Sequence, residues 1–376
     1  MSTPTPTKNV VVLGGGGAGV AVALALSKKL NHTRYNLILV DMRPHMVWLP
    51  AGARMVVTHD EAFTDTAVFP YDKVFPLGRG TFKLGKVVTI NEAEDQRGGE
   101  LEFENGETLG YEVLAVCAGS HWPGPLNFPS SRDQLDRFVG EWGTKFKEAK
   151  DILLVGAGAV GLELSGELRD RYPTKQITIV HSQTLVLNQT YPVKFREMVG
   201  KLFEARNIEF VLNDVVETFP NSDSGEVGLK SGRKLQADLI VRTSGPRPNT
   251  EFLASSLGED ILNEEKFVHV SPQLQVVNHP SVFAAGDIVE WEEEKQFGKA
   301  AGQAVIVADN IMSYLAGKPL KKRYTGWPEI IILTNGKSSG AAYLPMLWGL
   351  VLGPLFARMI KSKSLFLGSV RSRMGR

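Results

Sequence analysis

The residues best suited to chemistry in this chain are two glycine clusters, each following a short apolar run. The first begins at Gly14 and the second, about 140 residues later, at Gly156. Both have the spacing G-x-G-x-x-G, in which the first glycine makes a tight turn, the second lets a pyrophosphate approach the backbone and the third lets a helix pack on a strand. The helix N-terminus then faces the phosphates. Two copies predict a protein that holds two dinucleotides and passes electrons between them.

The expected contacts at the first dinucleotide are Gly14, Gly15, Gly16, Gly17, Ala18 and Gly19, and those at the second are Gly156, Gly158 and Gly161.

The elements around the first cluster predict a strand–turn–helix–strand unit. Residues 10–13 are typical of a buried parallel strand, 18–30 of a helix and 35–41 of a second strand that ends in Asp41. Asp41 lies 22 residues past Gly19, close to the ~20 expected for a carboxylate that binds a ribose hydroxyl. A solvated acid at a strand end is the alternative.

Residues 151–180 repeat this unit, but its second strand is followed by His181 instead of an acid. An acid there binds the ribose 2′-hydroxyl of NAD and repels a 2′-phosphate. A neutral His181 does not repel a 2′-phosphate as an acid would. No arginine that could attract this phosphate follows closely in the sequence. We therefore expect weak discrimination between NADH and NADPH, although a solvated loop histidine fits the pattern equally well.

Composition narrows the class of protein. The chain has 376 residues, of which 43% are hydrophobic and 22% charged, values typical of a globular protein with two or three domains. The net charge of +1 argues against a nucleic-acid partner. The first residues lack the apolar stretch of a signal peptide, so we expect a protein that is cytoplasmic and not secreted. We predict no metal site.

Cys117 is the only cysteine. A disulfide within the chain and a redox-active cysteine pair are both excluded, which favours a reducing compartment. We interpret Cys117 as a small buried hydrophobic residue. Electrons must then pass to an acceptor other than a cysteine pair of this chain.

The order of these motifs resembles the two-dinucleotide flavoproteins of the pyridine nucleotide–disulfide oxidoreductase fold. Besides the two glycine clusters, it includes strand ends at Gly119 and Gly245 and a late Ala-Gly-Asp at 285–287. The resemblance implies an α/β protein with two Rossmann-like domains, FAD at the first cluster and NADH or NADPH at the second. Gly286 and Asp287 would hold the flavin ribityl chain, although Asp287 is also suited to cap a helix.

The implied domains are an FAD domain over residues 1–125 and 268–320, an inserted NAD(P)H domain over 126–267, and a small C-terminal domain over 321–376.

Further residues resemble the ferroptosis-suppressor group of apoptosis-inducing-factor homologues, whose members reduce lipid quinones with NAD(P)H. They include Asp41, Arg54, His181 and the run from Lys361 to Phe366. The resemblance implies FAD contacts from Arg54 and Val87, and places Lys361 and Phe366 near the flavin and a quinone pocket. It also places Glu163 near the nicotinamide. The chain departs from that group in lacking a myristoylation signal, in Val47-Trp48, and in a more apolar segment over 341–356.

Several of these residues also have an ordinary structural interpretation. Glu163 and Glu167 are four residues apart and share one face of a helix, as in a surface pair. Arg54 and Lys361 are cations of types that are often solvated.

The C-terminal segment, from about Lys321 to Arg376, combines an apolar stretch with basic residues, and its residues 341–376 are the expected membrane contact. The stretch over 343–356 is broken by Pro345 and Pro354 and is too short to span a bilayer. After Glu329 there is no acid, and seven basic residues follow: Lys337, Arg358, Lys361, Lys363, Arg371, Arg373 and Arg376. This combination suits peripheral contact with anionic lipid, on a lipid droplet, mitochondrion or other intracellular membrane. Packing on the flavin domain, or a homodimer interface, is the alternative.

Together these features predict an FAD-dependent NAD(P)H:quinone oxidoreductase with a lipophilic, quinone-like acceptor. Two alternatives stay open. One is a cell-death effector of the apoptosis-inducing-factor type with secondary redox activity. The other is a flavin reductase that serves a partner electron carrier.

Overall fold

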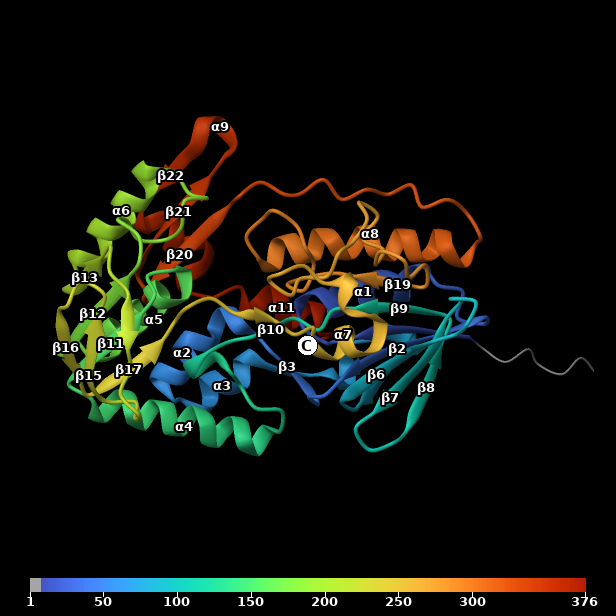
Figure 1. Ribbon diagram of the computed structural model, residues 1–376, viewed down its shortest axis with the longest axis horizontal. Coiled ribbons are helices and arrows are strands. Elements are labelled where there is room, and N and C mark those ends of the chain that lie inside the picture. Colours follow the sequence, from blue (N-terminus) through green and yellow to red (C-terminus); the bar gives the residue numbers. More distant parts are fainter. Residues whose placement is uncertain (1–7) are drawn as a thin grey trace, which may run out of the picture.

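A parallel sheet built around the first glycine cluster organises one half of the molecule (Figure 1). The computed structural model describes residues 8–376, apart from the side chains of residues 347 and 348. The strand order is β19-β9-β1-β2-β5, and the strands are β1 (Lys8–Leu13), β2 (Tyr35–Asp41), β5 (Thr81–Leu84), β9 (Val113–Val116) and β19 (Val282–Ala284). The apolar centre of β1 is fully buried, as a strand covered on both faces requires. Helices α1 (Gly17–Lys29) and α8 (Phe297–Leu315) pack together against it.

A second parallel sheet surrounds the second cluster, in the order β13-β12-β11-β17. Its strands are β11 (Asp151–Val155), β12 (Gln176–His181), β13 (Ile208–Leu212) and β17 (Leu239–Arg242), and its helices are α4 (Arg132–Glu148), α5 (Ala159–Arg171) and α6 (Val193–Glu204). The two predicted strand–helix–strand units are confirmed, with bounds shifted by only a few residues.

Each half also has a small antiparallel sheet, one of β6 (Val87–Glu92), β7 (Gly99–Phe103) and β8 (Thr108–Tyr111), the other of β14 (Val216–Thr218), β15 (Gly225–Leu229) and β16 (Lys234–Ala237). Shorter elements complete the two halves: β3 (His45–Val47), η1 (Leu49–Ala51), α2 (Gly52–Thr58), α3 (Glu61–Ala67), β4 (Val68–Pro70), η2 (Tyr71–Lys73), η3 (Pro76–Gly78), η4 (Gly124–Leu126) and η5 (Glu259–Ile261).

The chain crosses between the halves on two strands that pair with each other, β10 (Ser120–His121) and β18 (Arg247–Pro248). The first crossing is at Ser120–His121, and the domain boundary near residue 125 stays a prediction. The second comes earlier than the expected residue 267, because helix α7 (Glu251–Leu257) already packs on β6 of the first half. There the Ser256 hydroxyl accepts a hydrogen bond from the Ile90 amide at 3.0 Å.

The C-terminal segment lies across both halves instead of forming a domain of its own. It contains the antiparallel sheet β20 (Ile331–Asn335), β21 (Ser339–Leu344) and β22 (Leu350–Leu352), the short helices α9 (Met346–Gly349) and α10 (Pro354–Ala357), a π-helical turn over Arg358–Ser362, and α11 (Leu367–Arg373). Strand β20 packs on α5, whereas α11 returns to the first half (Figure 1).

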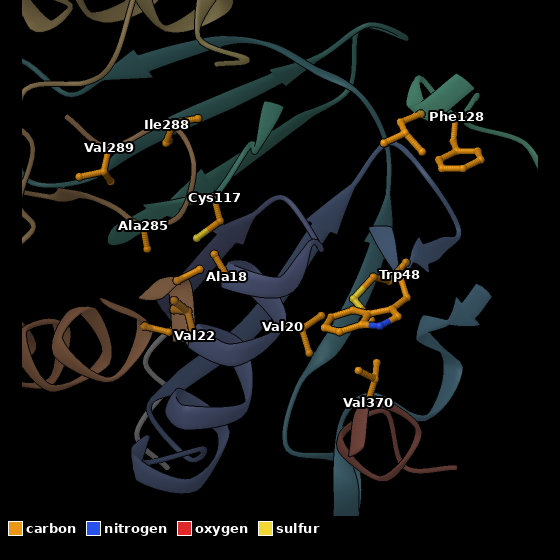
Figure 2. Close-up of a cluster of buried hydrophobic side chains, with 14 of the residues drawn as sticks. Ala18, Val20, Val22, Trp48, Cys117, Phe128, Ala285, Ile288, Val289 and Val370 are labelled. Atoms are coloured by element: carbon orange, nitrogen blue, oxygen red, sulfur yellow. The ribbon is translucent and has the colours of Figure 1, made fainter. Parts of the chain in front are cut away.

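Helix α11 is attached to the core of the first half. The Trp48 indole donates a hydrogen bond to the Leu365 carbonyl at 2.7 Å, and its ring lies next to Val20 of α1 and Val370 of α11 (Figure 2). Met374 is fully buried, and the Arg376 side chain pairs with Asp72. The tail of the segment is therefore packed on the first half, whereas the alternative of packing on the flavin domain concerned the apolar stretch over 343–356.

Other parts of the segment are exposed, among them Met346, Leu350, Leu355 and Met359. Within residues 8–376, no helix is both long and apolar enough to cross a membrane.

We expect Met374→Ala to lower the free energy of unfolding of the first half by about 2–5 kcal/mol, because it leaves a cavity in a closed core. Met359→Ala is the matched control, since its side chain is 75% exposed, and should change stability by less than about 0.5 kcal/mol. Denaturant unfolding followed by tryptophan fluorescence measures both. Equal effects would show that the Met374 side chain, directly after α11, is not part of the core.

Candidate functional site

The first glycine cluster has the geometry that a dinucleotide requires. Gly14 has φ +100°, and a Cβ at Gly19 would overlap the Gly14 carbonyl oxygen, so the turn and the close approach of α1 both exclude larger residues. A Cβ at Gly16 would meet no atom within 4 Å. The second glycine of the cluster thus faces open space, where a ligand could approach the backbone.

Asp41 fixes this loop from the end of β2. Its Oδ2 accepts from the Gly15 amide at 2.5 Å and its Oδ1 from the Arg43 amide at 2.7 Å. Burial raises the pKa of Asp41, while the two amides and the Arg43 charge oppose that rise. On the other side of the loop, the buried Tyr71 hydroxyl donates to the Gly15 carbonyl at 2.8 Å.

A cavity of about 380 Å³ opens at this loop and extends toward the second half, within the range of ~300–1,000 Å³ for ligand sites. It is lined from all three parts of the chain: Gly14, Gly16, Gly17, Ala18, Asp41 and Gly119 at the first cluster, Gly286, Asp287 and Lys295 after β19, Ala159, Val160 and Glu163 on α5, and Lys361. One ligand in this cavity would touch both halves and the C-terminal segment.

Buried polar atoms in the cavity wall lack partners within the described part of the chain. They are Arg43 Nε, His45 Nε2 and Trp122 Nε1. Such atoms are costly unless a ligand or water satisfies them. Burial and the charges of Arg43 and Arg132 lower the pKa of His45 to about 4, so its ring is neutral at pH 7. This polar wall beside a glycine loop fits a dinucleotide.

Asp287 reaches the cavity from the turn after β19. Its Oδ2 accepts from the Ser120 hydroxyl at 2.9 Å, and burial raises its pKa. No helix begins there, since α8 starts at Phe297, so the interpretation as a helix cap is wrong. Lys295 lies nearby, with its ammonium donating to the Val289 carbonyl at 2.7 Å and its pKa lowered by burial.

Glu163 and Lys361, which also line the cavity, form an ion pair. Lys361 Nζ donates to Glu163 Oε1 at 2.6 Å and to the Ile332 carbonyl at 3.0 Å. The same carboxylate oxygen accepts from the Thr334 amide at 2.9 Å. Both side chains are 14% exposed, so neither is the solvated surface charge that the sequence alone would allow.

The second glycine cluster, with Gly156, Gly158 and Gly161, connects β11 to α5. His181 at the end of β12 occupies the place that Asp41 has in the first half. Its Nδ1 accepts from the Ala157 amide at 3.2 Å, and its Nε2 faces the Leu187 carbonyl at 3.1 Å. This pairing places the proton on Nε2, and burial lowers the pKa of the ring, so His181 is a neutral loop anchor.

An arginine does lie close to this loop, although none follows closely in the sequence. Arg196 on α6 donates to the Val186 carbonyl at 2.9 Å and to the Gln183 side chain at 2.8 Å. Its side chain is buried, and this burial lowers its pKa. Arg196 stabilises the loop from beneath and leaves no exposed guanidinium for a phosphate.

Ten of the expected contact residues do not line the cavity: Gly15 and Gly19 of the first cluster, Gly156, Gly158, Gly161 and His181 of the second, and Arg54, Val87, Gly245 and Phe366. Arg54 is buried against Glu167, Val87 lies within β6, Gly245 follows β17 in the second half, and Phe366 packs against the core beside α11. Arg54 is thus paired with Glu167 and does not face the cavity, where the FAD contact was expected.

Cys117 lines the cavity as a buried thiol. Burial raises its pKa to about 12, so it is protonated at pH 7 and is the small hydrophobic residue that the sequence predicted.

Sequence patterns do not single out several cavity residues, namely Arg43, His45, Tyr71, Trp122, Lys295 and Phe297. Arg43, Trp122 and Lys295 lie on connections between elements, and His45, Tyr71 and Phe297 are the first residues of β3, η2 and α8. No periodic pattern marks which side chain points inward at such positions.

The family model that describes pyridine nucleotide-disulphide oxidoreductases matches residues 8–307. The chain belongs to this family. It is an FAD-dependent oxidoreductase that uses NAD(P)H, and with one cysteine it lacks the cysteine pair after which the family is named.

Relatives of this oxidoreductase cover most of its length. It is 39% identical over 85% of its chain to the FAD-dependent oxidoreductase FVFD30 of Flammulina velutipes, which is covered to 99%. It is 28% identical to ferroptosis suppressor protein 1 of Xenopus tropicalis, over 90% of this chain and 89% of that one. The structure of the sulfide:quinone oxidoreductase from Aquifex aeolicus superposes with a TM-score of 0.76 at 19% identity, covering 98% of this chain and 92% of that one.

We expect NADH and NADPH to give kcat/KM values within about tenfold of each other, because His181 adds no charge at the loop. His181→Asp should keep the bond to the Ala157 amide, as Asp41 does with Gly15, and reduce the NADPH value at least about tenfold relative to NADH. His181→Asn, which keeps an acceptor without a charge, is the control. Steady-state kinetics measure these values. A difference of about a hundredfold between kcat/KM for NADH and for NADPH in the wild-type protein would contradict this interpretation.

Proposed function

We propose that the chain is an NAD(P)H:quinone oxidoreductase whose acceptor is reduced next to Lys361. The observation that carries this proposal is the single cavity that joins the first glycine cluster to α5 of the second half and to Lys361. FAD, when bound, accepts a hydride from NAD(P)H and passes two electrons to the acceptor.

The chain's own residues divide the work of holding FAD. We assign the pyrophosphate to the amides of the Gly14–Gly19 loop and a ribose to Asp41, which already anchors that loop. Asp287 and Ser120 are hydrogen-bonded to each other at the cavity wall, which suits them to orient ribityl hydroxyls. The nicotinamide would lie beside Ala159, Val160 and Glu163, where the helix of the second cluster borders the same cavity.

Lys361 supplies a fixed positive charge at the reacting end. Its ammonium has three N–H groups, of which two bind Glu163 and Ile332, so one is left for a ligand in the cavity. A preorganised cation in a site shielded from water stabilises negative charge that develops on a quinone oxygen. Glu163 orients the ammonium, and Phe366 shapes the loop that follows it.

Two observations support a quinone as the acceptor: the residues that line the cavity, and the name of a structural neighbour. Cys117 is protonated and alone, so reduction of a disulfide through this chain is excluded. The cavity wall includes the aromatic rings of Trp48 and Phe297, which pack edge to face at 4.7 Å and suit a flat, apolar acceptor. A structural neighbour is named a sulfide:quinone oxidoreductase.

Lys361→Met should lower the turnover of NADH with a short-chain ubiquinone at least about tenfold, because it removes the fixed charge. The measurement is anaerobic NADH oxidation by the purified yellow protein, with and without quinone, followed at the flavin and nicotinamide bands. Lys337→Met, an exposed position of the same segment, is the control. Rapid flavin reduction that stalls despite quinone would contradict the proposed acceptor, and added ferredoxin would then test a protein carrier.

We also propose that the protein contacts membranes through an apolar–basic patch made of Leu355, Arg358, Met359, Ile360 and Lys363, all exposed. The Leu355 side chain is 79% exposed, which is unusual for leucine unless it meets a partner. The patch adjoins Lys361, so a quinone dissolved in lipid would have a short path to the cavity. Basic residues beside apolar ones suit anionic lipid.

The double variant Leu355→Glu/Met359→Glu should weaken binding to phosphatidylcholine vesicles that contain phosphatidylserine by at least about tenfold, because apolar area is lost from the membrane contact. Vesicle sedimentation measures this. Leu77→Glu, at a similarly exposed leucine in η3 of the first half, is the control. Unchanged binding of the double variant would exclude this patch as the contact. Deletion of residues 341–376 is not a suitable test, since it would also remove buried core.

A further inference from the structure

Arg54 connects three parts of the molecule through one buried guanidinium. It lies on α2 of the first half, and its Nε and Nη2 donate to the two carboxylate oxygens of Glu167 on α5 at 2.9 and 2.7 Å. Both side chains are only 3% exposed. Such a bidentate pair is strong and directional, and burial raises the pKa of Glu167 while the Arg54 guanidinium opposes that rise.

The same guanidinium also binds the main chain of the C-terminal segment. Arg54 Nη2 donates to the Ser362 carbonyl at 2.7 Å, and Nη1 lies 3.4 Å from the Lys363 carbonyl. These are the two residues that follow Lys361. Ser362 is fully buried and its hydroxyl donates to the Ser339 carbonyl at 2.8 Å.

The backbone around Lys361 has an unusual conformation that needs such contacts. Residues Arg358–Ser362 form a π-helical turn, a form that is rare and occurs often at functional sites. Leu365 and Phe366 then both have positive φ, 50° and 60°, which is unfavourable for side chains of their size. External hydrogen bonds must hold this loop, and Arg54 together with Trp48 supplies them.

Two carboxylates one turn apart on α5 therefore act on the same loop. Glu163 binds the Lys361 ammonium directly, whereas Glu167 orients Arg54, which binds the carbonyls next to it. Glu167 balances the charge of Arg54. The guanidinium therefore positions the loop through its hydrogen bonds and adds no net charge near Lys361.

We propose that Arg54 is a positioning residue: with Glu167 it fixes the backbone at residues 362 and 363 and thereby sets where the Lys361 ammonium lies in the cavity. This inference rests on the proposed role of Lys361. It also specifies why the residue is arginine. Lysine could pair with Glu167, but its compact ammonium lacks the planar set of five donors that reaches a carboxylate and two carbonyls together.

The test compares Arg54→Lys with Arg169→Lys. Arg169 is a matched control, because it is a buried arginine on α5 that donates to the carbonyls of Pro173, Lys175 and Asn207, away from Lys361. With FAD-loaded protein, Arg54→Lys should lower quinone-dependent kcat at least about fivefold, leave the KM for NADH within twofold, and shift the flavin absorption bands as Lys361→Met does. Arg169→Lys should change none of these.

A double variant separates positioning from general stability. If Arg54 acts through Lys361, then adding Arg54→Lys to Lys361→Met should cost no more than a further twofold in kcat. If the losses in kcat of the two single variants instead multiply in the double variant, the proposal is overturned. It is also overturned if the Arg54→Lys protein differs from the Arg169→Lys protein only in melting temperature.

Hydrogen exchange distinguishes this failure from failure of the proposed function. The amides of residues 361–366 should exchange at least tenfold faster in Arg54→Lys than in Arg169→Lys. If Lys361→Met leaves turnover and spectrum unchanged, the proposed role of Lys361 is wrong, and faster exchange would then show only that Arg54 holds the loop. Unchanged exchange would overturn the positioning role in every case.

Discussion

Helix α5 carries the interaction on which the rest of the site depends. Glu163 and Glu167 extend from one face of the helix that follows the second glycine cluster, and they bind Lys361 and Arg54 from two other parts of the chain. Both pairs are largely removed from water. Removal of one partner of a buried pair leaves an uncompensated charge, so the two halves and the C-terminal segment are held in one arrangement at the cavity. The cavity is accordingly lined by residues of the first half, of the second half and of the C-terminal segment.

The two glycine clusters show how the same fold is adapted to different ligands. In each, the residue at the end of the second strand accepts a hydrogen bond from an amide of the loop, Asp41 from Gly15 and His181 from Ala157. The structural task is the same, and only the charge differs. Replacing the carboxylate by a neutral imidazole keeps the loop fixed and removes the repulsion that a 2′-phosphate would meet.

The C-terminal segment has two different parts, one that packs into the first half and one that is exposed beside the cavity. Its amino-acid composition does not distinguish them. Its end, from Leu365 to Met374, is packed into the first half. The turn before it places Lys361 in the cavity and leaves Leu355, Met359 and Ile360 exposed. The proximity of an exposed apolar surface to the cavity is what a lipid-soluble acceptor would require, whereas a water-soluble acceptor would need no such surface.

By itself, the sequence determined the two parallel sheets, their glycine loops, the position of Asp41 at the end of β2 and the burial of Cys117, because these follow from steric rules and periodic patterns within segments of about 30 residues. Only the tertiary structure decided the partners of Arg54 and Lys361, the arginine beneath the His181 loop and the second crossing at Arg247–Pro248. Lys361 and Glu163 are 198 residues apart. Local patterns leave such a pair undetermined, since the partner of a buried charge is chosen by the packing of distant elements that must leave no polar group unpaired.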